Sequence, residues 1–172
     1  MPVFTAVEHE NIRKMTTEKP TEQIICTAKD ETELTICVCA EHCKTAEILL
    51  VSEAWAVKNS LTQQCRMDIQ LCLDELFSNI CRYAEIPKYS NSRELPVTII
   101  LKRENNNIVL VLSDNGKKFN PLNVPPPDLT ASVEERTIGG LGLYLVWSTA
   151  KKSEYFYKDG NNIVKLLLDA AS

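Results

Sequence analysis

Three polar side chains on one predicted helix are of the types that bind an ion and move a proton. Asp74, Glu75 and Asn79 lie in the segment LDELFSNICRYA, whose apolar residues recur at helical spacing. At roughly 100° per residue, Glu75 and Asn79 lie one turn apart at the edge of the buried stripe. A carboxylate and an amide in this position suit an oxygen-preferring cation such as Mg²⁺ and the removal of a proton from a hydroxyl group. Taken alone, the pair is more typical of a solvated helix flank.

Asp114 and Gly116 form a second candidate group, in the turn SDNGKKF that ends an apolar strand. Asp-Asn-Gly after a strand is usually only a turn, because glycine accepts a positive φ. In a ligand site, the Asp114 carboxylate would accept a hydrogen bond from an exocyclic amine, and Gly116 would let the backbone approach closely. The turn alone favours the simpler interpretation.

A third group is the glycine-rich segment TIGGLGL, residues 137–143, which opens a predicted helix. Three glycines in four positions cost backbone entropy. Their benefit would be exposed N–H groups and a positive helix N-terminus directed at phosphate. The segment is not a P-loop, because no Lys-Ser or Lys-Thr follows its last glycine, and it lies too late in the chain for a dinucleotide-binding fold.

The elements that must hold these groups alternate between β and α patterns. The first helix, over 43–58, has apolar residues at helical spacing: Ala46, Leu49, Leu50, Ala54 and Val57. A long loop over 120–138 with four prolines is either a functional lid or disordered. The predicted strands cover 24–27, 34–39, 97–102, 108–112, 153–158 and 163–168, and the other helices run over 62–84 and from 139–140 onward.

This order predicts an α+β fold, a two-layer α/β sandwich in which a mixed sheet has three helices on one face. Residues 1–20 show no clear period and are interpreted as an N-terminal extension, partly disordered, and residues 21–172 as one domain.

The composition limits the classes of partner and compartment. The 172 residues are 44% hydrophobic and 24% charged, as in an ordinary globular domain. A net charge of −4 argues against nucleic acid as the main partner, because phosphate binding needs clustered Lys and Arg. No apolar run is long enough to span a bilayer, and the first residues lack a signal-peptide pattern, so we expect a cytoplasmic protein and no membrane partner.

Seven cysteines are many for such a protein. Cys37, Cys39 and Cys43, with His42 between them, suggest zinc, but a free cysteine in an apolar strand more often acts as a small hydrophobic residue. Cys65 and Cys72, seven residues apart on one helix, are predicted core residues.

Together, the three polar groups resemble a known family. Acid-x₃-Asn on a helix, Asp-x-Gly after a strand, a long loop and Gly-Gly-Leu-Gly-Leu occur in the order found in GHKL (Bergerat-fold) ATPases, the histidine kinase-like fold of gyrase, sensor histidine kinases and the MutL mismatch-repair proteins. The tail GGLGLYLV, followed by YFYKDGNN, is most similar to the bacterial anti-sigma factor and serine-protein kinase branch. The resemblance covers about 34–168.

The resemblance implies ATP and Mg²⁺ as cofactors and gives the polar residues roles. Glu75 would be the general base for an incoming serine hydroxyl, and Asn79 would coordinate Mg²⁺. Asp114 would accept a hydrogen bond from the adenine amino group, and Gly116 would shape that pocket. Asn162, in the last hairpin, would complete the adenine side.

The resemblance also assigns the glycine segment to the phosphates, which would be wrapped by Gly140, Leu141, Gly142 and Leu143. Two positions depart from the family pattern. Tyr83 stands where a histidine is usual, and Lys118 stands where a glycine commonly precedes phenylalanine. Lys118 would crowd the pocket or offer a cation near the phosphates.

The implied function is a serine/threonine-protein kinase that acts as an anti-sigma factor. It would phosphorylate a serine of a STAS-type anti-anti-sigma partner, sequester a sigma factor and form a homodimer, with no direct nucleic-acid contact. The alternative is a non-catalytic module that uses ATP only to order its loop and bind a protein. A detached sensor-kinase domain is less favoured, because the only histidines, His9 and His42, lie on no plausible phospho-acceptor helix.

Overall fold

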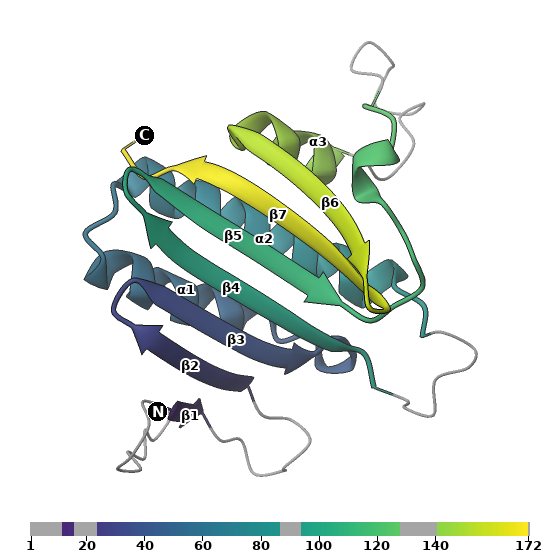
Figure 1. Cartoon of the computed structure of the whole chain (residues 1–172), viewed down its shortest axis with the longest axis horizontal. Helices are drawn as coiled ribbons and strands as arrows, with labels where there is room; N and C mark the ends of the chain where they lie inside the picture. The colour runs from purple at the N-terminus through teal and green to yellow at the C-terminus, as the bar shows by residue number, and fades with distance from the viewer. Residues whose placement is uncertain (1–11, 16–23, 87–93, 128–140, 172) are drawn as a thin grey trace.

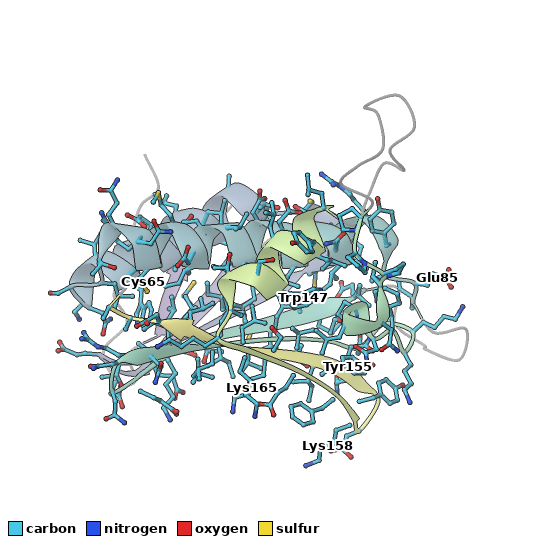
Figure 2. All side chains as sticks on the ribbon, turned by 90° about the horizontal axis from the view of Figure 1, so that it is seen from above. Cys65, Glu85, Trp147, Tyr155, Lys158 and Lys165 are labelled. Atoms are coloured by element: carbon cyan, nitrogen blue, oxygen red, sulfur yellow. The ribbon has the colours of Figure 1, made fainter. Side chains whose placement is uncertain are left out.

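A seven-stranded sheet, in the order β1-β2-β3-β4-β5-β7-β6, carries three α-helices on one of its faces (Figures 1 and 2). The computed structural model describes residues 12–15, 24–86, 94–127 and 141–171. The strands are β1 (Ile12–Met15), β2 (Ile24–Asp30), β3 (Glu33–Cys39), β4 (Pro96–Glu104), β5 (Asn107–Asp114), β6 (Lys152–Lys158) and β7 (Asn161–Asp169). The helices are α1 (Thr45–Lys58), α2 (Gln63–Tyr83) and α3 (Leu141–Thr149), with 3-10 turns η2 (Ala40–His42) and η3 (Pro121–Asn123).

The α+β two-layer sandwich is confirmed, but the mixed sheet is wrong. Every pairing between the described strands is antiparallel. Two helices connect β3 to β4 and bring the chain back to the end of the sheet where β3 stops, so β4 runs antiparallel to β3. A single helix, α3, connects β5 to β6, so β6 runs in the same direction as β5. Strand β7 then turns back from β6 and inserts between β5 and β6, so it is antiparallel to both (Figure 1).

Helix α2 forms where its sequence pattern predicts. Its N-cap is Thr62, whose side chain accepts a hydrogen bond from the Cys65 N–H at 3.2 Å and so satisfies one of the free donors of the first turn. Its buried face includes Cys65, Ile69, Cys72 and Leu76, as expected. The burial of Ile69 and of Leu76 each contributes about 1.5–3 kcal/mol, because these large aliphatic side chains leave water.

Helix α1 exists as predicted, but its buried face is different. The buried residues are Ile48, Ser52, Trp55 and Ala56, whereas Ala46, Leu50, Ala54 and Val57 are exposed and Leu49 packs at the edge of the core. The helix is apolar on nearly every side, so spacing alone does not select the face that meets the sheet. An exposed apolar stripe remains on α1; it consists of Ala46, Leu50, Ala54 and Val57.

The hydrophobic core lies between the helices and the inner face of the sheet. Alternate residues of β3, β4, β5 and β7 point into it, because successive side chains of a strand face opposite sides. The fully buried members on these strands include Ile36, Ile99, Leu101, Leu110, Leu112 and Leu166. This core fixes α2 over β5 and β7, the elements that carry the candidate site.

Strand β1 was not predicted. It pairs with β2 from Ile12↔Thr27 to Met15↔Ile24, inside the segment expected to be a partly disordered extension. A four-residue strand has too few residues to show alternation, and its pairing depends on the edge offered by β2. The other residues of 1–20, and residues 128–140 of the long loop and the glycine-rich segment, lie outside the described residues.

All seven cysteines lie in the described residues and are free. Cys65 and Cys72 are fully buried, as predicted, and burial raises the pKa of the Cys65 thiol to about 11 and that of Cys72 to about 12. In the part of the chain that the structure describes, no three His, Cys, Asp or Glu side chains gather as a metal site. No helix there is long and apolar enough to cross a bilayer.

Candidate functional site

A cavity of about 560 Å³ opens between α2, the inner face of β5 and β7, the turn after β5, and the start of α3. This volume lies within the range typical of small-molecule sites. Its apolar lining comprises Leu76, Ile80, Ala84, Leu112, Pro121, Val124, Leu143 and Val164. Its buried or half-buried polar lining comprises Asn79, Asp114 and Asn162. The exposed side chains around it are those of Tyr83, Glu85, Lys117, Lys118 and Phe119.

Asp114 is the buried carboxylate of the cavity, with 7% of its surface exposed. Its Oδ1 accepts hydrogen bonds from the Gly116 N–H at 2.8 Å and from Asn162 Nδ2 at 3.0 Å. Burial raises the pKa of Asp114 above its ordinary value, and these two donors partly offset the rise by stabilising the ionised form. Since both donors bind Oδ1, Oδ2 is the oxygen that remains for a donor on a ligand.

Gly116 holds the turn behind Asp114 rather than lining the cavity. A Cβ at this position would lie 2.8 Å from Asp114 Oδ1 and 3.4 Å from the Glu85 carbonyl oxygen and Leu95 Cδ1. The next residue, Lys117, donates its N–H to the same Glu85 carbonyl at 2.8 Å. Gly116 is therefore required for close packing, and not for the positive φ that a turn of this sequence suggests; among the described glycines only Gly160 has a positive φ.

Asn79 and Glu75 lie one turn apart on α2, as predicted, and Asn79 reaches the cavity. Among the described residues, no hydrogen bond occupies the Asn79 amide. Glu75 lies beside the cavity, between the lining residue Leu76 and the start of α3. A Cβ on Gly142 would overlap the Glu75 carboxylate, so the first turn of α3 lies directly against this carboxylate.

The glycine segment is only partly described. Leu143 is buried and lines the cavity, Gly142 lies against Glu75, and Leu141 is 49% exposed and lies outside the lining. Gly140 lies outside the described residues. The structure thus brings the start of α3 to the end of the cavity where Asn79 and Glu75 stand.

Asn162 lines the cavity next to Asp114, and its side-chain nitrogen binds protein atoms. Nδ2 donates to Asp114 Oδ1 at 3.0 Å and lies 3.3 and 3.2 Å from the carbonyl oxygens of Gly116 and Lys117. The amide therefore links β7 to the turn that carries Asp114.

The two departures from the family pattern both lie at the cavity. Tyr83 is 67% exposed at the end of α2. Lys118 also lines the cavity, and its Nζ lies 5.1 Å from the ring centre of Tyr157 in a cation–π contact. Lys117 forms an exposed ion pair with Glu85 at 3.3 Å.

Some residues of the site were not found from the sequence. Leu76 and Ile80 belong to the apolar stripe of α2 that packs on the core, and the same two residues line the cavity. Tyr155 was treated as part of a strand; its hydroxyl donates to Asn162 Oδ1 at 2.8 Å. A tyrosine whose ring faces the core usually has a hydrogen-bond partner for its hydroxyl, so Tyr155 could have been predicted to bond a polar group near the site.

The polar groups and apolar walls of the cavity fit a purine nucleotide with Mg²⁺. Asp114 Oδ2 can accept from an exocyclic amine, and the apolar walls can cover a flat ring. Asn79 offers an amide oxygen, a ligand type that Mg²⁺ accepts. Both residues line the same cavity, Asn79 from α2 and Asp114 from the end of β5.

Comparison with known proteins agrees with this chemistry. The family model of the histidine kinase-like ATPase domain matches residues 38–168. The chain therefore belongs to the histidine kinase-like ATPase domain family, whose description implies ATP binding. One similar protein is the serine/threonine-protein kinase BtrW of Bordetella bronchiseptica, 26% identical over 116 residues, which are 67% of this chain and 79% of that protein.

Proposed function

We propose that this protein is a serine/threonine-protein kinase that uses ATP with Mg²⁺ and acts as an anti-sigma factor. The observation that carries the kinase assignment is the position of Glu75, one helical turn from Asn79 and beside the nucleotide cavity. The similarity to a protein named as a serine/threonine kinase supports the same reaction.

In this proposal Asp114 and the apolar walls hold adenine, and Asn79 holds Mg²⁺ near the start of α3. Bound Mg²⁺ would neutralise charge on the phosphates. Leu143 and Gly142 lie where the phosphate chain would pass between Asn79 and α3. Gly140 and Leu141 complete the phosphate segment in the proposal.

The reaction would transfer the γ-phosphoryl group in line to a serine hydroxyl. The Glu75 carboxylate takes the hydroxyl proton, the serine oxygen forms a bond to the γ-phosphorus, and the bond from that phosphorus to the β–γ bridging oxygen breaks. The products are phosphoserine and ADP. Positioning and charge neutralisation supply most of the acceleration.

The protein partners in this proposal are a STAS-type anti-anti-sigma substrate, a sequestered sigma factor and a second copy of the chain. The first two rest on the resemblance alone. The homodimer has additional support from the exposed apolar stripe on α1, in which Leu50 is 61% and Val57 53% exposed. A cytoplasmic location is consistent with seven free thiols, since reducing compartments keep cysteines unpaired.

The second candidate is a non-catalytic module that binds ATP and a protein partner. It is favoured by one observation: Glu75 is not among the residues that line the cavity, and its carboxylate lies against Gly142 instead. In that case the carboxylate would only hold α3.

Transfer of label separates the two candidates. The protein is incubated with γ-labelled ATP, Mg²⁺ and a purified STAS-type anti-anti-sigma protein from the same organism, as wild type, Glu75→Gln and the control Asp74→Asn. Asp74 is the adjacent exposed acid, and its substitution removes the same charge from the same helix. The kinase assignment predicts phosphoserine with the wild type and the control, and a loss of about 100-fold or more with Glu75→Gln. ATP binding without transfer by any of the three proteins would establish the module instead.

A further inference from the structure

The oxygen of the Asn162 side chain is held by two donors. The Phe119 N–H donates to Asn162 Oδ1 at 3.0 Å, and the Tyr155 hydroxyl donates to the same oxygen at 2.8 Å. A backbone N–H can only donate, so the atom that faces it must be the amide oxygen. The amide therefore has a single orientation, with its nitrogen toward Asp114.

The Asn162 amide has no hydrogen-bonding capacity left for a ligand. An amide oxygen accepts two hydrogen bonds and an amide nitrogen donates two. Two donors already bind the oxygen, and three acceptors of the segment 114–117 surround the nitrogen. With 6% of its surface exposed, Asn162 can bind a nucleotide only by giving up a bond to the protein.

Tyr155 anchors the amide from β6. Its ring packs against the core, opposite Val164 of β7. Burial raises the pKa of the Tyr155 hydroxyl, and the negative charge of Asp114 raises it further. The hydroxyl therefore remains protonated at neutral pH and continues to donate to Asn162.

We propose that Tyr155 and Asn162 are a positioning pair that prepares Asp114 to recognise the exocyclic amino group of adenine. Tyr155 fixes the amide of Asn162, the amide holds Asp114 Oδ1, and Oδ2 is thereby directed to the ligand. Neither residue of the pair hydrogen-bonds the nucleotide in this proposal, since the hydrogen-bonding groups of Asn162 are occupied by protein and Tyr155 binds Asn162. The inference rests on the proposed binding of ATP and deepens it, because it assigns the choice of base to residues that act through Asp114.

The test compares ATP with inosine triphosphate, which has an oxygen in place of the amino group. Affinities are measured by calorimetry for the wild type, Tyr155→Phe and the control Tyr157→Phe. Tyr157 lies two residues further along the strand and is 43% exposed, and phenylalanine keeps the ring that Lys118 contacts. The wild type is expected to prefer ATP. In Tyr155→Phe the affinity for ATP falls about 3–10-fold, the effect of one hydrogen bond, while the affinity for inosine triphosphate changes less than about twofold.

A second variant gives an independent pH readout. Asn162→Asp places a carboxylate against Asp114 and two carbonyl oxygens, so ATP affinity falls more than in Tyr155→Phe. It recovers as the pH is lowered, because a protonated carboxyl group can again donate to Asp114. The control Asn161→Asp makes the same change one residue away, in the half-buried residue that opens β7, and leaves the pH profile of the wild type.

The outcomes separate the inference from the proposed function. Equal losses of both nucleotides in Tyr155→Phe, or no loss of either, would overturn the positioning pair and leave ATP binding in place. A wild type that binds ATP and inosine triphosphate equally would overturn it as well. A wild type that binds no ATP would overturn the proposed function, and the positioning pair with it.

Discussion

Asp114 combines burial with a hydrogen-bonding pattern that leaves one oxygen free for a ligand. The buried position raises its pKa, and the donors from Gly116 and Asn162 recover only part of that cost. A binding site commonly keeps such a group at the expense of stability, because the same carboxylate gains its partner when the ligand arrives. In the nucleotide-free protein, the cost of ionising buried Asp114 should therefore appear as a lower stability of the fold.

Asp114→Asn is expected to stabilise the nucleotide-free protein at neutral pH. The folded-state pKa of Asp114 is raised above 3.8, so its favourable contribution is complete below that pH and is lost as the pH rises through the folded-state value. Asparagine keeps an acceptor for both donors and does not titrate. Thermal unfolding from pH 4 to 7 should show that the melting temperature of the variant, relative to that of the wild type, increases as the pH rises. A difference in melting temperature that does not vary with pH would contradict this account.

Gly142→Ala is expected to remove catalysis without unfolding the protein. The new Cβ would overlap the Glu75 carboxylate, which is the end of a flexible side chain and can move aside at little cost. Transfer of labelled phosphate should fall at least about tenfold, while the melting temperature changes little. Combining it with Glu75→Gln should cause no further loss, because both changes remove the same function. Full additivity of the two losses would show that Gly142 acts elsewhere.

At the scale of single residues, the sequence predicted where the candidate residues lie on their helix and strand better than it predicted their contacts. Glu75 and Asn79 follow from helical spacing, and Asp114 follows from its place at the end of a strand. The bond from Tyr155 to Asn162 requires the register of β6 on β7, which no local pattern contains. The same is true of the contact between Gly142 and Glu75, since it joins two helices far apart in the chain.

Among the secondary structure elements, α1 shows where periodicity stops being informative. Nearly every face of this helix carries apolar residues, so the sequence predicts a helix but not which side is buried. The mixed sheet was predicted wrongly for a similar reason. The direction of β6 follows from the single helix before it, but the insertion of β7 between β5 and β6 depends on tertiary packing, which no local pattern shows. The exposed stripe on α1 is one apolar surface of the helix layer that has no partner among the described residues.

Leu50→Glu should convert a dimer to a monomer if the stripe on α1 is the contact between two copies. Leu50 is the most exposed large apolar residue of the helix, and a charge buried in an interface is costly. Light scattering after gel filtration should give the mass of two chains for the wild type and of one chain for the variant. The control Phe156→Glu lies on β6, in the sheet layer, and should remain dimeric. A wild type that is monomeric at every concentration would exclude the homodimer.

Across the whole molecule, the cavity joins both layers. Its floor is the inner face of β5 and β7, its wall is α2, and its far end is the start of α3, so a ligand bound there contacts segments from 76 to 164. The order of the motifs was sufficient to predict the family, whereas β1 and the shape of the cavity depend on contacts between distant segments. A ligand that bridges the layers should stabilise the whole fold.

ATP with Mg²⁺ should raise the melting temperature more than ATP with a chelator. Binding to the folded state alone adds about 2.7 kcal/mol at a ligand concentration 100 times the dissociation constant, and loss of the metal weakens binding. In Asn79→Ala, the part of the rise in melting temperature that depends on Mg²⁺ should be abolished, and the part due to adenine binding should be retained. An equal response of Asn79→Ala and the wild type to the chelator would remove Asn79 as the metal ligand.

The most direct test is a calorimetric titration of ATP–Mg²⁺ into the wild type, Asp114→Asn and the control Asp74→Asn. The account predicts one ATP per chain for the wild type and the control, and an affinity about 10–100-fold lower for Asp114→Asn, the effect of a hydrogen bond to a charged group. The same affinity in all three proteins would contradict the assignment of this cavity to ATP.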